Sequence, residues 1–343
     1  MKTTLMRAAA RSVWMLAVVF LPVSVAIAQT TTARIVGAAN DFLSTLQQEQ
    51  RQRVLFAFDD EQQRLRWSNL PASSVRRAGL SMGELNEAQR SAALALVSSA
   101  LSRRGYEKVQ QIMDADEVLK QGAAKPIFGK DLYFISILGT PSEKAPWMLQ
   151  FGGHHLALNI TIAGQRGVLT PSLIGAQPAL YAVNGTTIRP LGQESDKAFA
   201  LLNAFDDAQR KQAILNYKVA DLVLGPGQDG KTIQPEGLKA SAMSEQQRVM
   251  LLDLIAEWSG IVHDSAASAR MAEIKAGLNE TWFAWSGPTT VSPGRNGTAY
   301  YRIQGPNLVI EYAPQPLGGD PSMHLHTMYR DPTNDYGRKV APK

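Results

Sequence analysis

Four histidines in two distant pairs are the residues of this chain best suited to chemistry. His154 and His155 lie in the sequence Phe-Gly-Gly-His-His, whereas His324 and His326 lie in Met-His-Leu-His-Thr-Met, and the chain has only five histidines. Neutral imidazole is the commonest protein ligand for borderline transition metals. If the fold brings the two pairs together, they predict a site for a divalent metal ion.

The spacing within each pair predicts how its side chains point. Residues i and i+2 of a strand share a face, so His324 and His326 should stand side by side. His154 and His155 are adjacent and would face opposite sides of a regular strand, unless the preceding glycines open a bulge. One of them should then be a ligand, and the other should orient a ligand or hold a carboxylate. The alternative is a hydrogen-bonded histidine pair without metal.

Three charged residues near the second pair are candidates for catalysis. Glu311 lies in an apolar run and is a ligand, a general base or the partner of Arg302 on a neighbouring strand, because buried charges are usually paired. Arg330 could hold an anionic substrate group. Asp331 could fix the tautomer of an imidazole.

The absence of cysteine limits the chemistry further. It excludes disulfides, thiolate zinc sites, iron–sulfur clusters and cysteine nucleophiles. Zinc is therefore the first expectation, with copper or iron next. Met323 and Met328 beside the histidines slightly favour copper, although methionine more often packs in a core. His263 stands alone and is interpreted as structural.

Residues 1–28 have the features of an export signal. Basic residues precede an apolar run at 12–23, and Ala26-Ile27-Ala28 matches the small-x-small pattern before a cleavage site. The run is shorter than the roughly 20 residues of a membrane span, and an uncleaved anchor is the alternative. We expect a periplasmic or secreted protein with no membrane span after signal cleavage.

The charge of the chain argues against nucleic acid as a partner. The formal net charge is +5, and Lys2, Arg7 and Arg11 would leave with the signal, so 5 minus 3 leaves +2 on the mature chain. No basic stretch interleaved with aromatic residues is present. The expected partner is a small-molecule or peptide substrate.

The predicted helices and strands are grouped in separate stretches of the chain. Helical spacing of apolar residues dominates about 33–122 and 194–276, and β-rich runs bounded by glycine and proline dominate about 126–192 and 280–329. Blocks of this kind, rather than alternating βαβ units, predict an α+β fold with a mainly antiparallel sheet and helices packed around it. We expect a single domain over residues 29–343.

A short sequence motif, an acidic residue followed by any residue, Gln and Arg, recurs at predicted helix starts. It occurs at Glu87–Arg90, Asp207–Arg210 and Glu245–Arg248, and Asn86 and Ser244 should be N-caps. The irregular spacing favours independent helix starts over the alternative, an internal duplication of a helical hairpin.

Two longer stretches carry a resemblance to a known family. Trp-Met-Leu-Gln-Phe-Gly-Gly-His-His-Leu-Ala-Leu-Asn at 147–159, and His324-Leu-His326 through Arg330-Asp331-Pro332, resemble the signature of the bacterial "domain of unknown function 3500" family. The resemblance covers nearly the whole mature chain. It implies an exported bacterial protein with one family-wide domain, but it implies no reaction.

The pattern of residues therefore predicts an exported metalloenzyme. The chain lacks the Gly-x-Ser-x-Gly elbow, His-Glu-x-x-His, the dinucleotide fingerprint and the phosphate loop. A histidine- and glutamate-bound metal would lower the pKa of its water and polarise a substrate carbonyl or phosphoryl group, so hydrolysis is the default reaction. The alternatives are a periplasmic metal- or solute-binding protein without catalysis and a copper or iron oxidoreductase.

Overall fold

The computed structural model describes residues 30–123, 127–317 and 319–340. The expected signal peptide at 1–28 lies outside these residues. Within the described ranges, no helix is both long and apolar enough to cross a membrane.

The helices form two groups along the chain. Asn86 and Ser244 are N-caps as predicted, because their side chains accept hydrogen bonds from the backbone N–H groups of Gln89 and Gln247. The first group is α1 (Thr31–Thr45), α2 (Gln48–Val54), α3 (Glu61–Arg64), α4 (Glu87–Ala100) and α5 (Arg103–Gln121). The second group is α6 (Gly192–Asn203), α7 (Asp207–Ala213), α8 (Glu245–Ser259) and α9 (Asp264–Ala276).

One large sheet runs through the molecule. Its path is β1-β3-β4-β5-β7-β14-β13-β12-β11-β10, and every pair along it is antiparallel except β1 with β3. The strands of the first half are β1 (Leu55–Phe56), β2 (Leu80–Ser81), β3 (Phe134–Leu138), β4 (Trp147–Gly153), β5 (Leu156–Ala163), β6 (Arg166–Val168) and β7 (Ser172–Ala176). Those of the second half are β10 (Leu238–Lys239), β11 (Trp282–Ser286), β12 (Tyr300–Gly305), β13 (Leu308–Pro314) and β14 (Leu325–Arg330); β8 (Tyr181–Val183) and β9 (Thr186–Ile188) form a separate hairpin.

The predicted fold class is confirmed: the protein is α+β with a mainly antiparallel sheet. The predicted blocks differ from the structure in two places. The first helical block contains β1, β2 and an irregular segment at 66–79, and the second is interrupted at 214–237. Both interruptions contain proline and glycine, which break helices.

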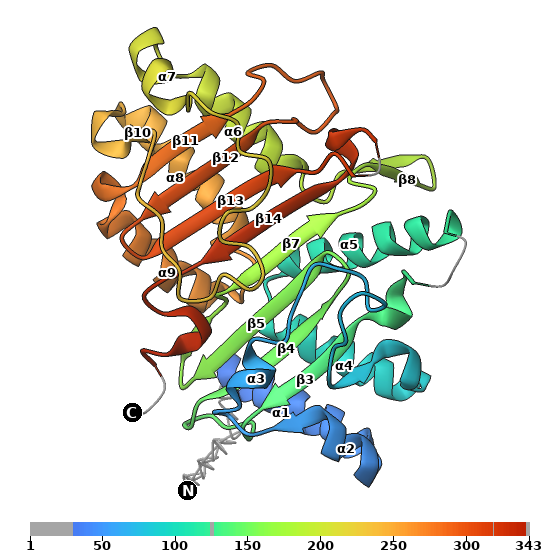
Figure 1. Cartoon of the computed structure of the whole chain (residues 1–343). Helices are drawn as coiled ribbons and strands as arrows, with labels where there is room; N and C mark the ends of the chain where they lie inside the picture. Colours follow the sequence, from blue (N-terminus) through green and yellow to red (C-terminus); the bar gives the residue numbers. More distant parts are fainter. Residues whose placement is uncertain (1–29, 124–126, 318, 341–343) are drawn as a thin grey trace, which may run out of the picture.

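The two faces of the sheet are covered differently. The longer helices pack on one face, where Trp258 of α8 donates its indole N–H to Thr327 of β14 at 3.0 Å (Figure 1). Irregular segments cross the opposite face, where Val223 and Leu224 donate their backbone N–H groups to Glu311 of β13. The opposite face is the one that carries His326, because side chains of Thr327 and His326 point to opposite sides of β14.

The order of the elements shows an internal duplication, although the irregular spacing of the motif had favoured independent helix starts. The order α1, α2, β2, α4, α5, β3, β4, β5, β7 is repeated as α6, α7, β10, α8, α9, β11, β12, β13, β14. The halves meet at the antiparallel pair β7–β14 in the middle of the sheet. Equivalent contacts recur: Gln89 donates to the Thr45 carbonyl, and Gln247 donates to the Ala204 carbonyl.

Replacing two helical glycines by alanine should change the free energy of unfolding in opposite directions. A Cβ on Gly105 of α5 would lie 2.2 Å from the Ile261 carbonyl oxygen, whereas a Cβ on Gly37 of α1 would meet nothing within 4 Å. Gly37→Ala should raise the free energy of unfolding by about 1 kcal/mol through helix propensity. Gly105→Ala should lower it by about 1–3 kcal/mol through the clash. Urea denaturation of both variants checks this, and a shift of the same sign in both would contradict it.

Candidate metal centre

The first histidine pair forms the two-residue loop between β4 and β5. His155 has φ 62°, a left-handed conformation that costs a non-glycine residue about 1 kcal/mol or more. Its N–H donates to the Asn69 carbonyl at 3.1 Å, and its carbonyl accepts the N–H of Gly175 at 2.7 Å. The two adjacent histidines therefore do not occupy a regular strand, and their ring centroids lie 3.8 Å apart.

The second pair lies where β14 begins. His324 directly precedes the strand in an extended conformation, and His326 is its second residue. Their Nε2 atoms are 3.1 Å apart, so the two side chains share a face as predicted.

Three of the four histidines converge. Nε2 of His155 lies 2.9 Å from Nε2 of His324, and one ligand atom from each of His155, His324 and His326 lies within 4.8 Å of the others. All three rings are buried. Gly175 faces His326 across β7–β14, and a Cβ there would lie 3.1 Å from Cδ2 of His155. Glycine at this position therefore lets the His155 ring close onto the strand.

A carbonyl group fixes the tautomer of His324. Its Nδ1 lies 2.7 Å from the Leu317 carbonyl oxygen. A carbonyl only accepts hydrogen bonds, so Nδ1 carries the hydrogen and the Nε2 lone pair of the neutral ring points at the other two histidines. Such Nδ1–H···O=C bonds are what orient histidines that bind metals.

Burial keeps these imidazoles uncharged. It lowers the pKa of His324 to about 4 and the pKa of His155 well below its ordinary value, and the neighbouring imidazoles act in the same direction. Near neutral pH both rings therefore offer a lone pair, which is the form that a metal ion requires.

Two of the three separations are close to those around a small divalent ion, and the third is no more than 4.8 Å. Tetrahedral zinc with Zn–N bonds of about 2.0–2.1 Å places its nitrogen ligands about 3.3 Å apart. The Nε2 separations of 2.9 and 3.1 Å differ from this value by a few tenths of an ångström. If all three bound one ion, a fourth position would be open to water, which is typical of catalytic rather than structural zinc sites.

Polar groups surround the ligand atoms of His326. The Asn69 side-chain Nδ2 lies 3.3 Å from His326 Nε2. The Asp221 Oδ1 lies 3.7 Å from His326 Nδ1, and the same oxygen accepts a hydrogen bond from the Gln315 amide at 2.7 Å. Asp221 is thus placed to orient His326 from the ring nitrogen remote from the ligand atoms.

His154, one of the four candidate ligands, lies outside the group of three and holds a carboxylate, the role predicted for one histidine of this pair. Its Nδ1 lies 2.6 Å from Oδ1 of Asp116 on α5, and the other Asp116 oxygen accepts the N–H of Gly129 at 2.8 Å. The His154 carbonyl accepts the Tyr133 hydroxyl at 2.8 Å, which holds the loop. Because both His154 and Asp116 are buried, the pair is a fixed carboxylate–imidazole dyad beside the three-histidine group.

The prediction that Glu311 joins the histidines is wrong. Glu311 is fully buried and accepts hydrogen bonds from the N–H groups of Val223 and Leu224 and from the Tyr300 hydroxyl. It faces Arg302 across β12–β13, but the Arg302 guanidinium donates to Glu236 at 2.8 Å. Glu311 therefore anchors the irregular segment at 214–237 to the sheet.

Arg330 and Asp331 also lie away from the site. Arg330 lies four residues beyond His326, or about 13 Å along an extended strand. Its guanidinium pairs with Asp229 at 3.1 Å and Asp335 at 2.9 Å. Asp331 lies 3.0 Å from Arg270 of α9. Both predicted roles are wrong, because the side chains are fully engaged in ion pairs elsewhere.

Two other residues have structural roles. Met328 packs in a small apolar cluster with Ala157 and Leu173, so it does not support copper. His263 is the N-cap of α9 and accepts the N–H of Ala266, which confirms the structural interpretation.

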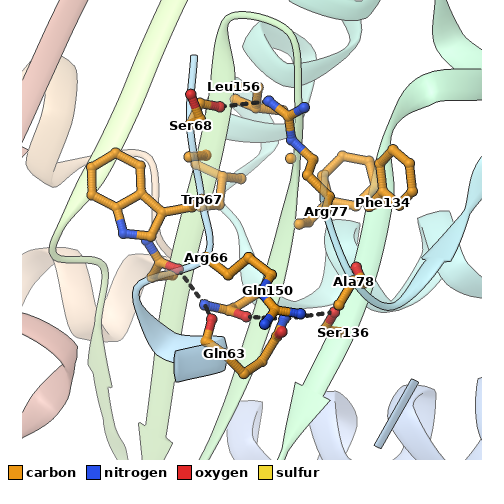
Figure 2. A pocket seen from close by; sticks show the side chains of 15 residues that line it. Gln63, Arg66, Trp67, Ser68, Arg77, Ala78, Phe134, Ser136, Gln150 and Leu156 are labelled. Carbon is orange, nitrogen blue, oxygen red and sulfur yellow. Dashed lines mark hydrogen bonds between the residues drawn. The ribbon is translucent and has the colours of Figure 1, made fainter. Parts of the chain in front are cut away.

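A polar network holds part of the segment that covers this face of the sheet. Gln63 of α3 donates to Gln150 at 3.0 Å, and Gln150 donates to Asn159 at 2.9 Å. Figure 2 shows these side chains around a small pocket. The cavity measures about 30 Å³, close to the volume of one water molecule, so it cannot hold a substrate.

Arg77 attaches the same covering segment to the histidine loop. Its Nη2 donates to the carbonyls of Ser68, Leu70 and Gly153 at 2.6–2.9 Å. Ser68 and Leu70 flank Asn69, and Gly153 directly precedes His154. Arg77 therefore holds the segment around Asn69 beside the histidine loop. Its contact with Ser68 is drawn in Figure 2.

Sequence reasoning missed Asn69, Asp116 and Asp221. Asp116 could have been found from the sequence, because it continues the buried face of α5 formed by Val109 and Ile112. A carboxylate on an apolar helix face needs a partner. Asn69 and Asp221 lie in irregular segments, where no periodicity predicts a direction.

A comparison with protein families places the chain. The family described as "Protein of unknown function (DUF3500)" matches residues 28–338, nearly the whole chain, and the protein belongs to this family. No curated protein and no solved structure matches the chain.

The metal-free protein should lose stability in mild acid. The pKa of His324 falls from 6.5 in the unfolded chain to about 4 in the folded one, so between these values only the unfolded state gains this proton. The free energy of unfolding should therefore fall, on the order of 2 kcal/mol, as pH drops from about 6.5 to about 4. Denaturation with a chelator present measures this. His324→Phe should reduce the dependence, and an unchanged dependence would contradict the assignment.

Proposed function

We propose that this DUF3500 protein is a zinc-dependent hydrolase of the periplasm or the secreted fraction. One observation carries the proposal: three buried imidazoles converge, and Nε2 of His324 lies 2.9 Å from Nε2 of His155 and 3.1 Å from Nε2 of His326. Three buried imidazoles at one point, one of them held by a carbonyl at Nδ1, are the arrangement that a divalent ion would bind. The signal-like features of residues 1–28 support the location.

Each ligand would have a defined role. Nε2 of His155, His324 and His326 would hold zinc, and zinc would lower the pKa of a bound water to about 7. The Leu317 carbonyl keeps His324 in the required tautomer. Asp221 is placed to do the same for His326 as the ligands adjust to an ion.

The His154–Asp116 dyad supplies a proton acceptor. The Asp116 carboxylate at 2.6 Å occupies Nδ1 of His154, which leaves Nε2 to take a proton from the water. The carboxylate would stabilise the imidazolium that forms, and the same nitrogen would return the proton to the leaving group. Asn69 Nδ2–H, 3.3 Å from His326 Nε2, would donate to the substrate oxygen as negative charge develops.

A metal-binding protein without catalysis is the second candidate. The burial of all three ligands beneath Asn69 favours it, because a carrier benefits from a closed site. The two functions differ in whether the dyad matters for turnover, as the second experiment below tests.

Metal content tests the site directly. Protein purified from the periplasm should contain about one zinc per chain, measured by elemental mass spectrometry. His155→Ala and the double variant His324→Ala/His326→Ala should lose it, whereas His263→Asn, which alters only the N-cap of α9, should retain it. Circular dichroism verifies folding of each variant. Metal-free wild-type protein that gains no thermal stability on zinc addition would overturn the proposal.

The dyad should affect turnover more than metal binding. With 4-nitrophenyl acetate as an activated ester, His154→Gln should lower kcat about 100-fold or more while zinc content stays near one per chain. Asp116→Asn should act in the same direction, because the imidazolium loses its carboxylate. Unchanged kcat in both variants would remove the dyad from the mechanism. Absence of turnover in zinc-loaded wild-type protein would favour the carrier.

A further inference from the structure

We propose that the substrate is a peptide that lies across both sides of the histidine group and is cut at an internal bond between apolar residues. The inference rests on the proposed hydrolase and adds its substrate class. It is carried by two cavities at the end of the sheet where β7 and β13 end and β14 begins (Figure 1).

The larger cavity lies on the β13 side of the site. Its volume is about 670 Å³, and Tyr300 and Ala313 line it. Ala313 is the cross-strand partner of His326, so this wall lies one strand away from a metal ligand on the same face of the sheet. The wall also includes Ala220, the neighbour of Asp221, whose carboxylate lies 3.7 Å from His326. The wall of this cavity therefore lies one strand from His326.

The smaller cavity reaches the site from the β7 side. Its volume is about 390 Å³, and His324 itself forms part of the wall. Pro178 follows β7, Leu119 lies on α5, and Met323 precedes His324. The strand order β7-β14-β13 places the two cavities on opposite sides of β14. Each exceeds the roughly 300 Å³ of a small-ligand pocket, so substrate groups can bind on both sides of the ion.

The walls favour apolar side chains. Four prolines, at 288, 314, 316 and 321, line the larger cavity together with Tyr217, and Lys218 is the one charged residue among its described lining residues. In the smaller cavity Val118, Leu119, Phe128 and Met323 predominate, and the Asp320 carboxylate there pairs with Arg295. These apolar wall residues would contact apolar side chains of an extended peptide.

The charges argue against phosphate esters. Among the described residues, no lysine or arginine makes a hydrogen bond or ion pair with the side chains of His155, His324 or His326. Enzymes that transfer phosphoryl groups use cationic side chains to bind the phosphate oxygens. A neutral amide carbonyl needs only the metal and a donor such as Asn69.

The reaction balances without a further reactant. The oxygen of water bonds to the acyl carbon, the amide C–N bond breaks, and the nitrogen receives the proton that His154 Nε2 has taken from the water. The products are a carboxylate and an amine, and no group is oxidised or reduced.

The test uses the zinc-loaded full mature chain and hexapeptides blocked at both ends, with mass spectrometry to locate the cut. Peptides with leucine or phenylalanine on both sides of the central bond should be cut there at least tenfold faster than peptides with aspartate or lysine. Equal rates for all four residues, cleavage of terminal bonds alone when unblocked peptides are supplied, or no peptide cleavage would overturn the inference.

Variants that fill each cavity separate this inference from the proposed function. Leu119→Trp fills the smaller cavity, and Thr298→Trp fills the larger one from an exposed position. Each should raise KM for the preferred hexapeptide at least tenfold, with zinc content and the rate on 4-nitrophenyl acetate unchanged. The control is Val249→Trp, an exposed site on α8 that lines neither cavity, and it should change nothing.

The outcomes are distinguishable. If the wild-type protein binds no zinc, the proposed zinc hydrolase is overturned. If the protein binds zinc and hydrolyses the ester but cleaves no peptide, the proposed hydrolase stands and the peptide substrate is overturned. An unchanged KM in both cavity variants would show that these cavities do not bind the peptide.

Discussion

The antiparallel pairing of β7 with β14 is the interaction on which the rest of the molecule depends. It joins the two halves of the sheet, and it is formed by strands that are about 150 residues apart in the chain. The same pairing places Gly175 opposite His326, and the Gly175 N–H holds the His155 carbonyl. Without this register, the two histidine pairs would not meet. The candidate metal centre is therefore a product of the joint between the halves.

The duplication also explains why one end of this joint carries the histidines and the other does not. The β12–β13 turn, equivalent to the His154–His155 loop, contains Pro306 and Asn307. At this end Arg270 of α9 contacts the Tyr329 hydroxyl and Asp331, each at 3.0 Å. An arginine with its carboxylate and phenol partners thus lies at this end, on the face of the sheet that the longer helices cover. The two halves keep one architecture but have different chemistry at equivalent ends.

Buried charges serve the architecture of the histidine-bearing face. Glu311 accepts hydrogen bonds from two backbone N–H groups of the 214–237 segment, and Arg330 donates to the carbonyls of Leu224 and Gly225 in that segment. Arg77 does the same for the segment that contains Asn69. Segments without regular structure cannot satisfy their own backbone groups, so charged side chains from the sheet and from the segments themselves satisfy them. These charges position Asn69 and Asp221 near the histidines without entering the site.

Local patterns determined a large part of this protein. Apolar spacing predicted the helices and strands and the α+β class, because amphipathic periodicity is a property of neighbouring residues. The i, i+2 spacing of His324 and His326 predicted their shared face, and the isolation of His263 predicted a structural role. Composition excluded thiolate chemistry, since the chain has no cysteine.

Only the tertiary structure decided which residues meet. Periodicity assigns a face to a side chain but not its neighbour across the sheet, so Glu311 and Asp331 were candidates while Asp221 and Asp116 were missed. The choice between His154 and His155 depended on a left-handed residue in a two-residue loop, which the sequence does not reveal because the strain is balanced by contacts with Asn69 and Gly175. Strand register and the paths of irregular segments are long-range properties. They arise when distant segments pack, and they place three imidazoles at one point.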